Sequence, residues 1–248
     1  MIDLLQPQRT IDESNRDTSR YVRSYLLMRV LLGALAVALP PMLVLGDGSG
    51  FDADPFPRGS LSSYFYSGMR EIFVGTLSAT AVFLVTYKVA ERHLDNTLSW
   101  LAGVAVLGVA VFPTTTSGAV ELTPLQEQWG EPLVGGIHYA CAAGFIGSLA
   151  VISFFFGVRE GGRPARPGKR SPTFWRNYHW TCAGAIAAAI AFIIVAKLVG
   201  WPPKSLLIGE WAAIWGFGAS WLMKGLELDI LSSSRPRPVT SSPAARPD

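Results

Sequence analysis

The sequence predicts an all-α, polytopic membrane protein with six transmembrane helices and both termini in the cytoplasm. Half of its 248 residues are hydrophobic, 16% are charged, and the mean hydropathy is +0.31, as in helical membrane proteins rather than soluble domains. Six apolar runs approach the roughly 20 residues needed to cross about 30 Å of hydrocarbon. The expected organisation is a cytoplasmic tail over residues 1–23, a six-helix domain over 24–225 and a disordered cytoplasmic tail over 226–248.

The six spans follow from where the apolar runs start and stop. The second begins near Ser67, because the apolar run after Glu71 is too short to cross alone. In the first span, Pro40-Pro41 is expected to kink or end the helix, and Pro113 stops the third. The spans are expected over residues 24–46, 67–87, 96–112, 135–156, 178–200 and 204–224.

Lysine and arginine residues set the orientation of these spans. Under the six-span arrangement, 17 of the 21 lie on the side of the amino terminus and four on the other side. The positive-inside rule then places both termini in the cytoplasm, and the side chain of Arg29 is expected to snorkel to that interface. The charges flank apolar runs instead of forming a basic amphipathic face, so nucleic acid is not an expected partner.

A polar pocket is predicted at the outer ends of the second, fourth and sixth spans. All three spans enter the membrane from outside, so Glu71, His138 and Glu210 are expected at similar depths, roughly 6 to 10 Å along their helices. Ionisable groups at membrane depth favour the bundle interior, a partner or water. The pocket is expected to face outward and to be lined by Tyr64, Tyr66, Arg70, Glu71, His138 and Glu210.

Each of these residues also has a purely structural interpretation. Glu210 suits an acid near a helix N-terminus, paired with Lys197 or Arg70, and His138 suits an interfacial histidine bonded to a loop carbonyl. The tyrosines suit an interfacial aromatic belt. The nearby serines are candidate nucleophiles by proximity alone: Ser60, Ser62, Ser63 and Ser67.

No cofactor and no metal site is predicted. A zinc site built from Glu71, His138 and Glu210 is chemically allowed but unusually poor in histidine. Cys141 and Cys182 both fall inside apolar runs, which favours packing over a disulfide.

The favoured function is to bind or move a small solute or amphiphile, because this needs only a partly apolar cavity with a few polar groups. The common motifs of phosphate-binding loops, zinc proteases, paired cysteines and serine hydrolases do not occur. Two alternatives stay open: a membrane-embedded lipid hydrolase, with or without a metal, and a non-catalytic subunit of a larger membrane complex. The second would use the small-residue faces of the fourth and sixth spans to pack against another protein or a second copy of the chain. Whether the protein is an enzyme is therefore left open.

Four segments resemble a bacterial family of multi-pass membrane proteins of unknown function. They are Tyr66-Ser-Gly-Met-Arg-Glu-Ile-Phe-Val-Gly75, Phe112-Pro-Thr114, Ile137-His-Tyr139 and the run from Glu210 to Lys224-Gly225. The resemblance covers residues 60–225 and implies a location in the bacterial cytoplasmic (inner) membrane. The chain is more distantly similar to membrane hydrolases related to alkaline ceramidases, which hold zinc with several histidines. It departs from their pattern because His138 is its one outer-leaflet histidine.

Overall fold

The computed structural model describes residues 6–47, 57–87, 93–116, 121–165, 170–202 and 204–226, and every regular element in these ranges is helical. Residues 1–5 of the predicted amino-terminal tail (1–23) and residues 227–248 of the predicted carboxyl-terminal tail (226–248) lie outside the described residues. Two short elements are η2 (Ser62–Tyr66) and α4 (Pro124–Trp129). The long helices are α1 (Gln6–Gly46), α2 (Arg70–Thr86), α3 (His93–Val111), α5 (Glu131–Gly161), α6 (Pro172–Val199) and α7 (Lys204–Leu226).

Helices occupy the places where the apolar runs predicted them, and four of them contain candidate membrane spans. These are long and apolar enough by length and composition: Leu26–Gly46, Glu131–Gly161, Pro172–Val199 and Lys204–Lys224. The apolar part of α3, Asn96–Val111, is shorter, and α2 has 17 residues. The described residues therefore form an all-helical protein with four candidate spans, and the prediction of six depends on α2 and α3.

The first helix differs from its prediction at the amino-terminal end. It begins at Gln6, inside the predicted tail, and Pro7 fits there because the first turn of a helix needs no N–H donor from that residue. It continues through Pro40-Pro41 to Gly46, the predicted end of the span, so these prolines do not end the helix early. Because Pro41 has no N–H, the Val37 carbonyl loses its helical partner. The Trp215 indole N–H of α7 donates to that carbonyl instead, at 3.0 Å. In membrane proteins, neighbouring helices commonly supply hydrogen bonds to the backbone groups that a proline leaves unpaired.

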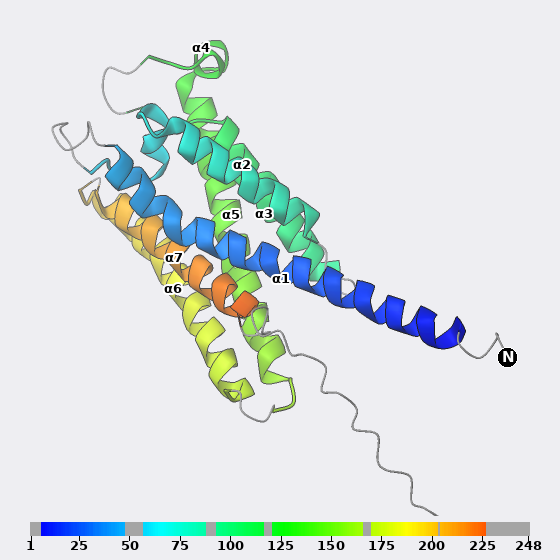
Figure 1. Cartoon of the computed structure of the whole chain (residues 1–248). Helices are drawn as coiled ribbons and strands as arrows, with labels where there is room; N and C mark the ends of the chain where they lie inside the picture. The colour runs from blue at the N-terminus through cyan, green and yellow to red at the C-terminus, as the bar shows by residue number, and fades with distance from the viewer. Residues whose placement is uncertain are drawn as a thin grey trace, which may run out of the picture.

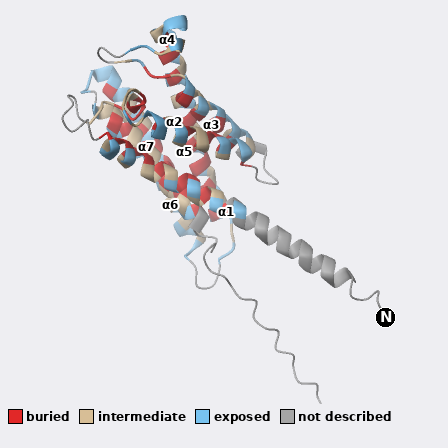
Figure 2. Ribbon diagram, turned by 45° about the horizontal axis from the view of Figure 1, so that its top comes forward, coloured by how far each residue is buried: buried red, intermediate tan, exposed pale blue. Residues whose placement is uncertain are grey.

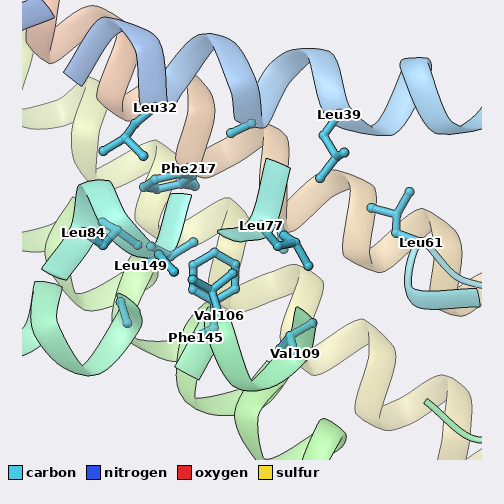
Figure 3. Close-up of a cluster of buried hydrophobic side chains, with 14 of the residues drawn as sticks. Leu32, Leu39, Leu61, Leu77, Leu84, Val106, Val109, Phe145, Leu149 and Phe217 are labelled. Carbon is cyan, nitrogen blue, oxygen red and sulfur yellow. The ribbon is translucent and has the colours of Figure 1, made fainter. Parts of the chain in front are cut away.

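The six long helices pack as a closed ring in the order α1, α7, α6, α5, α3, α2, with α2 returning to α1 (Figure 1). Buried side chains fill its centre, among them Leu32, Leu77, Val106, Phe145 and Phe217 (Figure 3). Some helices approach very closely. A Cβ added to Gly33 of α1 would lie 2.7 Å from the backbone nitrogen of Leu222 in α7, so only glycine fits at this crossing.

Exposed residues lie along the outer faces of the helices (Figure 2), and many of them are large and apolar. Leu198 is 82% exposed, Val82 62% and Ile194 53%. A monomeric soluble protein rarely exposes such continuous apolar surface. The exposed faces of the helices are therefore those expected to contact lipid in a bilayer.

Candidate functional site

The ring has two polar ends, which we name after residues of α7. The Glu210 end contains residues 57–69, the last turn of α3 and the whole of α4. The Lys224 end contains the last turns of α5 and the first turns of α6. All six residues predicted to form the pocket lie at the Glu210 end. Most ionisable groups at the Lys224 end had been interpreted as orientation signals.

At the Glu210 end, residues 57–69 fold into the ring instead of lying on top of it. Leu61 and Tyr64 are fully buried, with exposed fractions of 2% and 0%. The Leu61 N–H donates to Oε2 of Glu210 at 2.6 Å, and the Leu207 N–H donates to the Gly59 carbonyl at 3.0 Å. The partly buried carboxylate of Glu210 thus binds the amino-terminal end of η2, where backbone N–H groups have no helical acceptor.

The serines of this segment are engaged in its local backbone. The Ser63 hydroxyl donates to the Ser60 carbonyl at 2.6 Å, and the Ser63 N–H donates to the Ser60 hydroxyl at 3.0 Å. The Ser67 hydroxyl donates to the Tyr64 carbonyl at 2.8 Å. Such bonds are typical of serine in turns, so these hydroxyls stabilise the turn. None of these three bonds supports a nucleophilic role.

Tyr66 links η2 to the next loop. Its hydroxyl donates to the Thr114 carbonyl at 2.7 Å and accepts from the Gln126 amide at 2.7 Å. Gln126 is buried and forms a capping box with Thr123 at the start of α4. Burial raises the pKa of Tyr66, so the hydroxyl stays protonated and able to donate at neutral pH.

Tyr64 differs from Tyr66 because its hydroxyl has no hydrogen-bond partner in the described part of the chain. The Arg58 guanidinium lies 5.8 Å from its ring centroid, and Arg58 is paired with Asp47 at 2.7 Å. Burial raises the pKa of Tyr64. A buried neutral hydroxyl without a protein partner can bind water or a polar group of a ligand.

His138 is held by the end of α3. Its Nδ1 lies 2.7 Å from the Phe112 carbonyl, which follows the last turn of α3 and precedes Pro113. The side chain is 2% exposed. Its neighbour Tyr139 contacts Thr115 at 2.9 Å, and the Lys197 ammonium lies 4.1 Å from the Tyr139 ring centroid. His138 therefore connects α5 to α3.

Arg70 and Glu71 open α2 and are both exposed. The Arg70 guanidinium lies 4.3 Å from the Phe65 ring centroid. In the described ranges no hydrogen bond or ion pair joins Glu71, His138 and Glu210, and no three metal-ligating side chains gather. Glu71, His138 and Glu210 lie at the same end of the ring but have different neighbours. That the three side chains line one cavity stays a prediction.

The Lys224 end holds a buried charged cluster that the sequence interpretation missed. The Lys224 ammonium of α7 pairs with Glu160 of α5, and each side chain is 2% exposed. Arg163 also pairs with Glu160, at 3.0 Å. In the same layer, Nδ1 of His179 in α6 lies 2.9 Å from the Ser220 hydroxyl of α7. These contacts tie α5, α6 and α7 together.

Arg29 adds α1 and α2 to this cluster. It is 7% exposed and does not snorkel to water as expected, because Nε donates to the Tyr87 hydroxyl at 2.7 Å. Tyr87 directly follows α2. The Phe156 ring lies at the centre of the cluster, with the charged groups of Arg29, Arg159 and Lys224 at 5.3, 5.1 and 5.7 Å from its centroid.

The sequence did carry a signal for this cluster. The six-span arrangement puts Arg29, His179 and Lys224 at similar depths near one end, by the same reasoning that grouped Glu71, His138 and Glu210. One helix, α7, takes part in both ends, through Glu210 and through Ser220 and Lys224.

No family model, curated protein or solved structure matches this chain.

Proposed function

We propose that the protein crosses a bacterial cytoplasmic membrane six times and binds and moves a small solute or amphiphile, which enters from the outside at the Glu210 end. The observation that carries this proposal is that α7 is held by polar contacts at both ends. At one end Glu210 accepts from Leu61, and at the other Lys224 pairs with Glu160. Buried ionisable groups inside a membrane protein are costly and commonly mark a ligand or ion pathway.

The course of α2 supports six spans. It starts at Arg70, just after η2 at the Glu210 end, and is followed by Tyr87 at the Lys224 end. Tyr87 bonds to Arg29, and its ring centroid lies 5.1 Å from that of Trp221. At 17 residues it is about 25 Å long, close to the hydrocarbon thickness. Because α2 runs from one polar end to the other beside α1, it crosses wherever α1 crosses.

The charge distribution supports the orientation. Arg159, Arg163, Arg170, Arg176 and Lys224 all lie at the Lys224 end. Acidic residues predominate in the loop and short helix at the opposite end, with Glu121, Glu127 and Glu131. The positive-inside rule then assigns the Lys224 end to the cytoplasm and the Glu210 end to the outside.

The proposed pocket consists of Tyr64, Tyr66, Arg70, Glu71, His138 and Glu210. Residues 57–69 occupy its centre, so we propose that this segment moves when a ligand enters. That movement would break the bond from Leu61 to Glu210, the bond from Leu207 to Gly59 and the pair between Arg58 and Asp47. It would also break the two hydrogen bonds of the Tyr66 hydroxyl, with Thr114 and Gln126. A ligand with a polar head could replace the Leu61 N–H at Glu210 while its apolar part contacts the tyrosines.

Glu210→Gln tests this proposal. The amide keeps an acceptor oxygen for Leu61 but removes the charge, so we expect about tenfold weaker binding of a cationic or hydrogen-bond-donating amphiphile, equivalent to about 1.4 kcal/mol. The probe is lysophosphatidylethanolamine carrying an NBD group on its acyl chain, titrated against the protein in nanodiscs. Energy transfer from tryptophan to NBD reports binding, and Trp211 follows Glu210 directly.

Glu127→Gln is the matched control. Glu127 is an exposed acid of α4 at the same end and is not part of the proposed pocket, so its replacement should leave binding unchanged. The proposal fails if Glu210→Gln binds the probe as tightly as the original protein. It also fails if Glu210→Gln and Glu127→Gln lose affinity for the probe by the same factor.

A further inference from the structure

The outer surface of α5 and α6 at the Lys224 end carries a stack of three side chains. The Trp180 ring lies flat on the Phe154 ring, with centroids 5.7 Å apart and an interplanar angle of 8°. The Arg176 guanidinium lies 5.1 Å from the Trp180 ring centroid. Phe154 is 46% exposed and Trp180 39%, so the stack faces the surroundings of the ring.

Two glycines of α5 allow the side chains of this stack to pack directly against the helix backbone. A Cβ on Gly157 would lie 2.4 Å from Cδ1 of Trp180, and a Cβ on Gly161 would lie 2.7 Å from Cδ of Arg176. Gly157 and Gly161 are one turn apart on α5, as Arg176 and Trp180 are on α6, so each glycine receives one side chain. The helix surface thus fixes both the indole and the aliphatic part of the arginine.

Arg176 has no carboxylate partner in the described ranges. Its Nε donates to the Asn177 amide oxygen at 3.3 Å, and its other polar contact is the Trp180 ring. Arg163, which follows α5, differs because it is paired with Glu160. A guanidinium that packs against an indole and has no carboxylate partner is available to bind a phosphate. It can donate two parallel hydrogen bonds to the phosphate oxygens.

We propose that this stack binds an anionic phospholipid, with the phosphate of the headgroup on Arg176 and an acyl chain along Trp180, Phe154 and Val151. Val151 lies one turn before Phe154 on α5 and is 42% exposed, so the apolar track leads away from the arginine toward the middle of the bilayer. Tryptophan prefers the interfacial depth at which headgroup and chain meet. Basic sites between helices at the cytoplasmic side recognise acidic headgroups.

This inference requires that the helices lie in a bilayer and does not depend on the proposed pocket at the Glu210 end. The stack belongs to the Lys224 end, where anionic lipids of the cytoplasmic leaflet would meet it. An anionic lipid is a better fit than a protein partner because the exposed part of the stack combines one positive charge with a short apolar track of Trp180, Phe154 and Val151.

Native mass spectrometry of the full chain tests the proposal. The protein in detergent is incubated with equal amounts of phosphatidylglycerol and phosphatidylcholine, and the retained lipids are counted. The original protein should retain phosphatidylglycerol in preference, and Arg176→Gln should lower that retention by about tenfold, as expected for the loss of one charged, hydrogen-bonded contact. Arg176→Lys keeps the charge but loses the two-bond geometry and should give an intermediate value.

Arg170→Gln is the matched control. Arg170 precedes α6 and lies 4.4 Å from the Phe174 ring centroid, and neither residue contacts the glycines of α5 that hold Trp180 and Arg176. This variant should retain phosphatidylglycerol like the original protein. Equal retention of the two lipids by the original protein, undiminished retention by Arg176→Gln, or an equal loss in Arg170→Gln would overturn the proposal.

Discussion

Lys224→Met is expected to lower the free energy of unfolding by about 3–5 kcal/mol, because it leaves the Glu160 carboxylate buried without its ammonium partner. Both side chains are 2% exposed, so water cannot replace the lost partner without opening the ring. Arg163 still pairs with Glu160 and limits the loss to the lower part of this range. Unfolding with increasing amounts of sodium dodecyl sulfate in mixed micelles measures the change.

A double variant separates the ion pair from the packing of the lysine stem. Glu160→Gln combined with Lys224→Met removes both charges, and it should recover most of the stability lost in the single variant. Lys197→Met replaces an exposed lysine at the other end and should change stability by less than about 1 kcal/mol. A loss below about 1 kcal/mol in Lys224→Met would contradict a buried, energetically important pair.

Trp221→Ala is expected to cost about 3–5 kcal/mol, since truncating a fully buried aromatic residue leaves a large cavity. Trp221 is 0% exposed, and its ring lies 5.1 Å from Tyr87, 5.5 Å from Phe156 and 5.3 Å from Phe217. It therefore connects α7 to the end of α2 and to α5. The same unfolding experiment measures the loss.

Trp215→Ala is the comparison for this variant. Trp215 is on the same helix but is 46% exposed, and its main contribution is the bond to the Val37 carbonyl. A cost of about 1 kcal/mol is expected for that bond. Equal losses in the two tryptophan variants would mean that Trp221 is not packed at the centre of the cluster.

Much of the fold could be predicted because run length and hydropathy report directly on membrane helices. The helices lie where the apolar runs placed them. The group that compensates for Pro41 in α1 could not be predicted, because it is a donor from a distant helix, the Trp215 indole. The early start at Gln6 was missed because a polar helical segment lacks the apolar signal that defines a span.

The polar ends were less predictable than the helices. Depth along the spans grouped Glu71, His138 and Glu210 at one end, but their partners are backbone groups: the Leu61 N–H for Glu210 and the Phe112 carbonyl for His138. Backbone partners leave no pattern in the side-chain sequence. The cluster of Arg29, Glu160 and Lys224 was overlooked because charges at span ends were interpreted as orientation signals, although the same depth argument applies to them.

Cysteine labelling of the connection between α2 and α3 tests the six-span arrangement most directly. In a chain with Cys141→Ala and Cys182→Ala, single cysteines are introduced by Glu91→Cys and Glu121→Cys, and spheroplasts are treated with a membrane-impermeant maleimide. Position 91 falls outside the described residues, but it lies between the end of α2 and the start of α3. We expect Glu121→Cys to be modified on intact spheroplasts and Glu91→Cys to be modified only after permeabilisation. Equal modification of both positions on intact spheroplasts would show that α2 and α3 do not cross the membrane and would contradict the account.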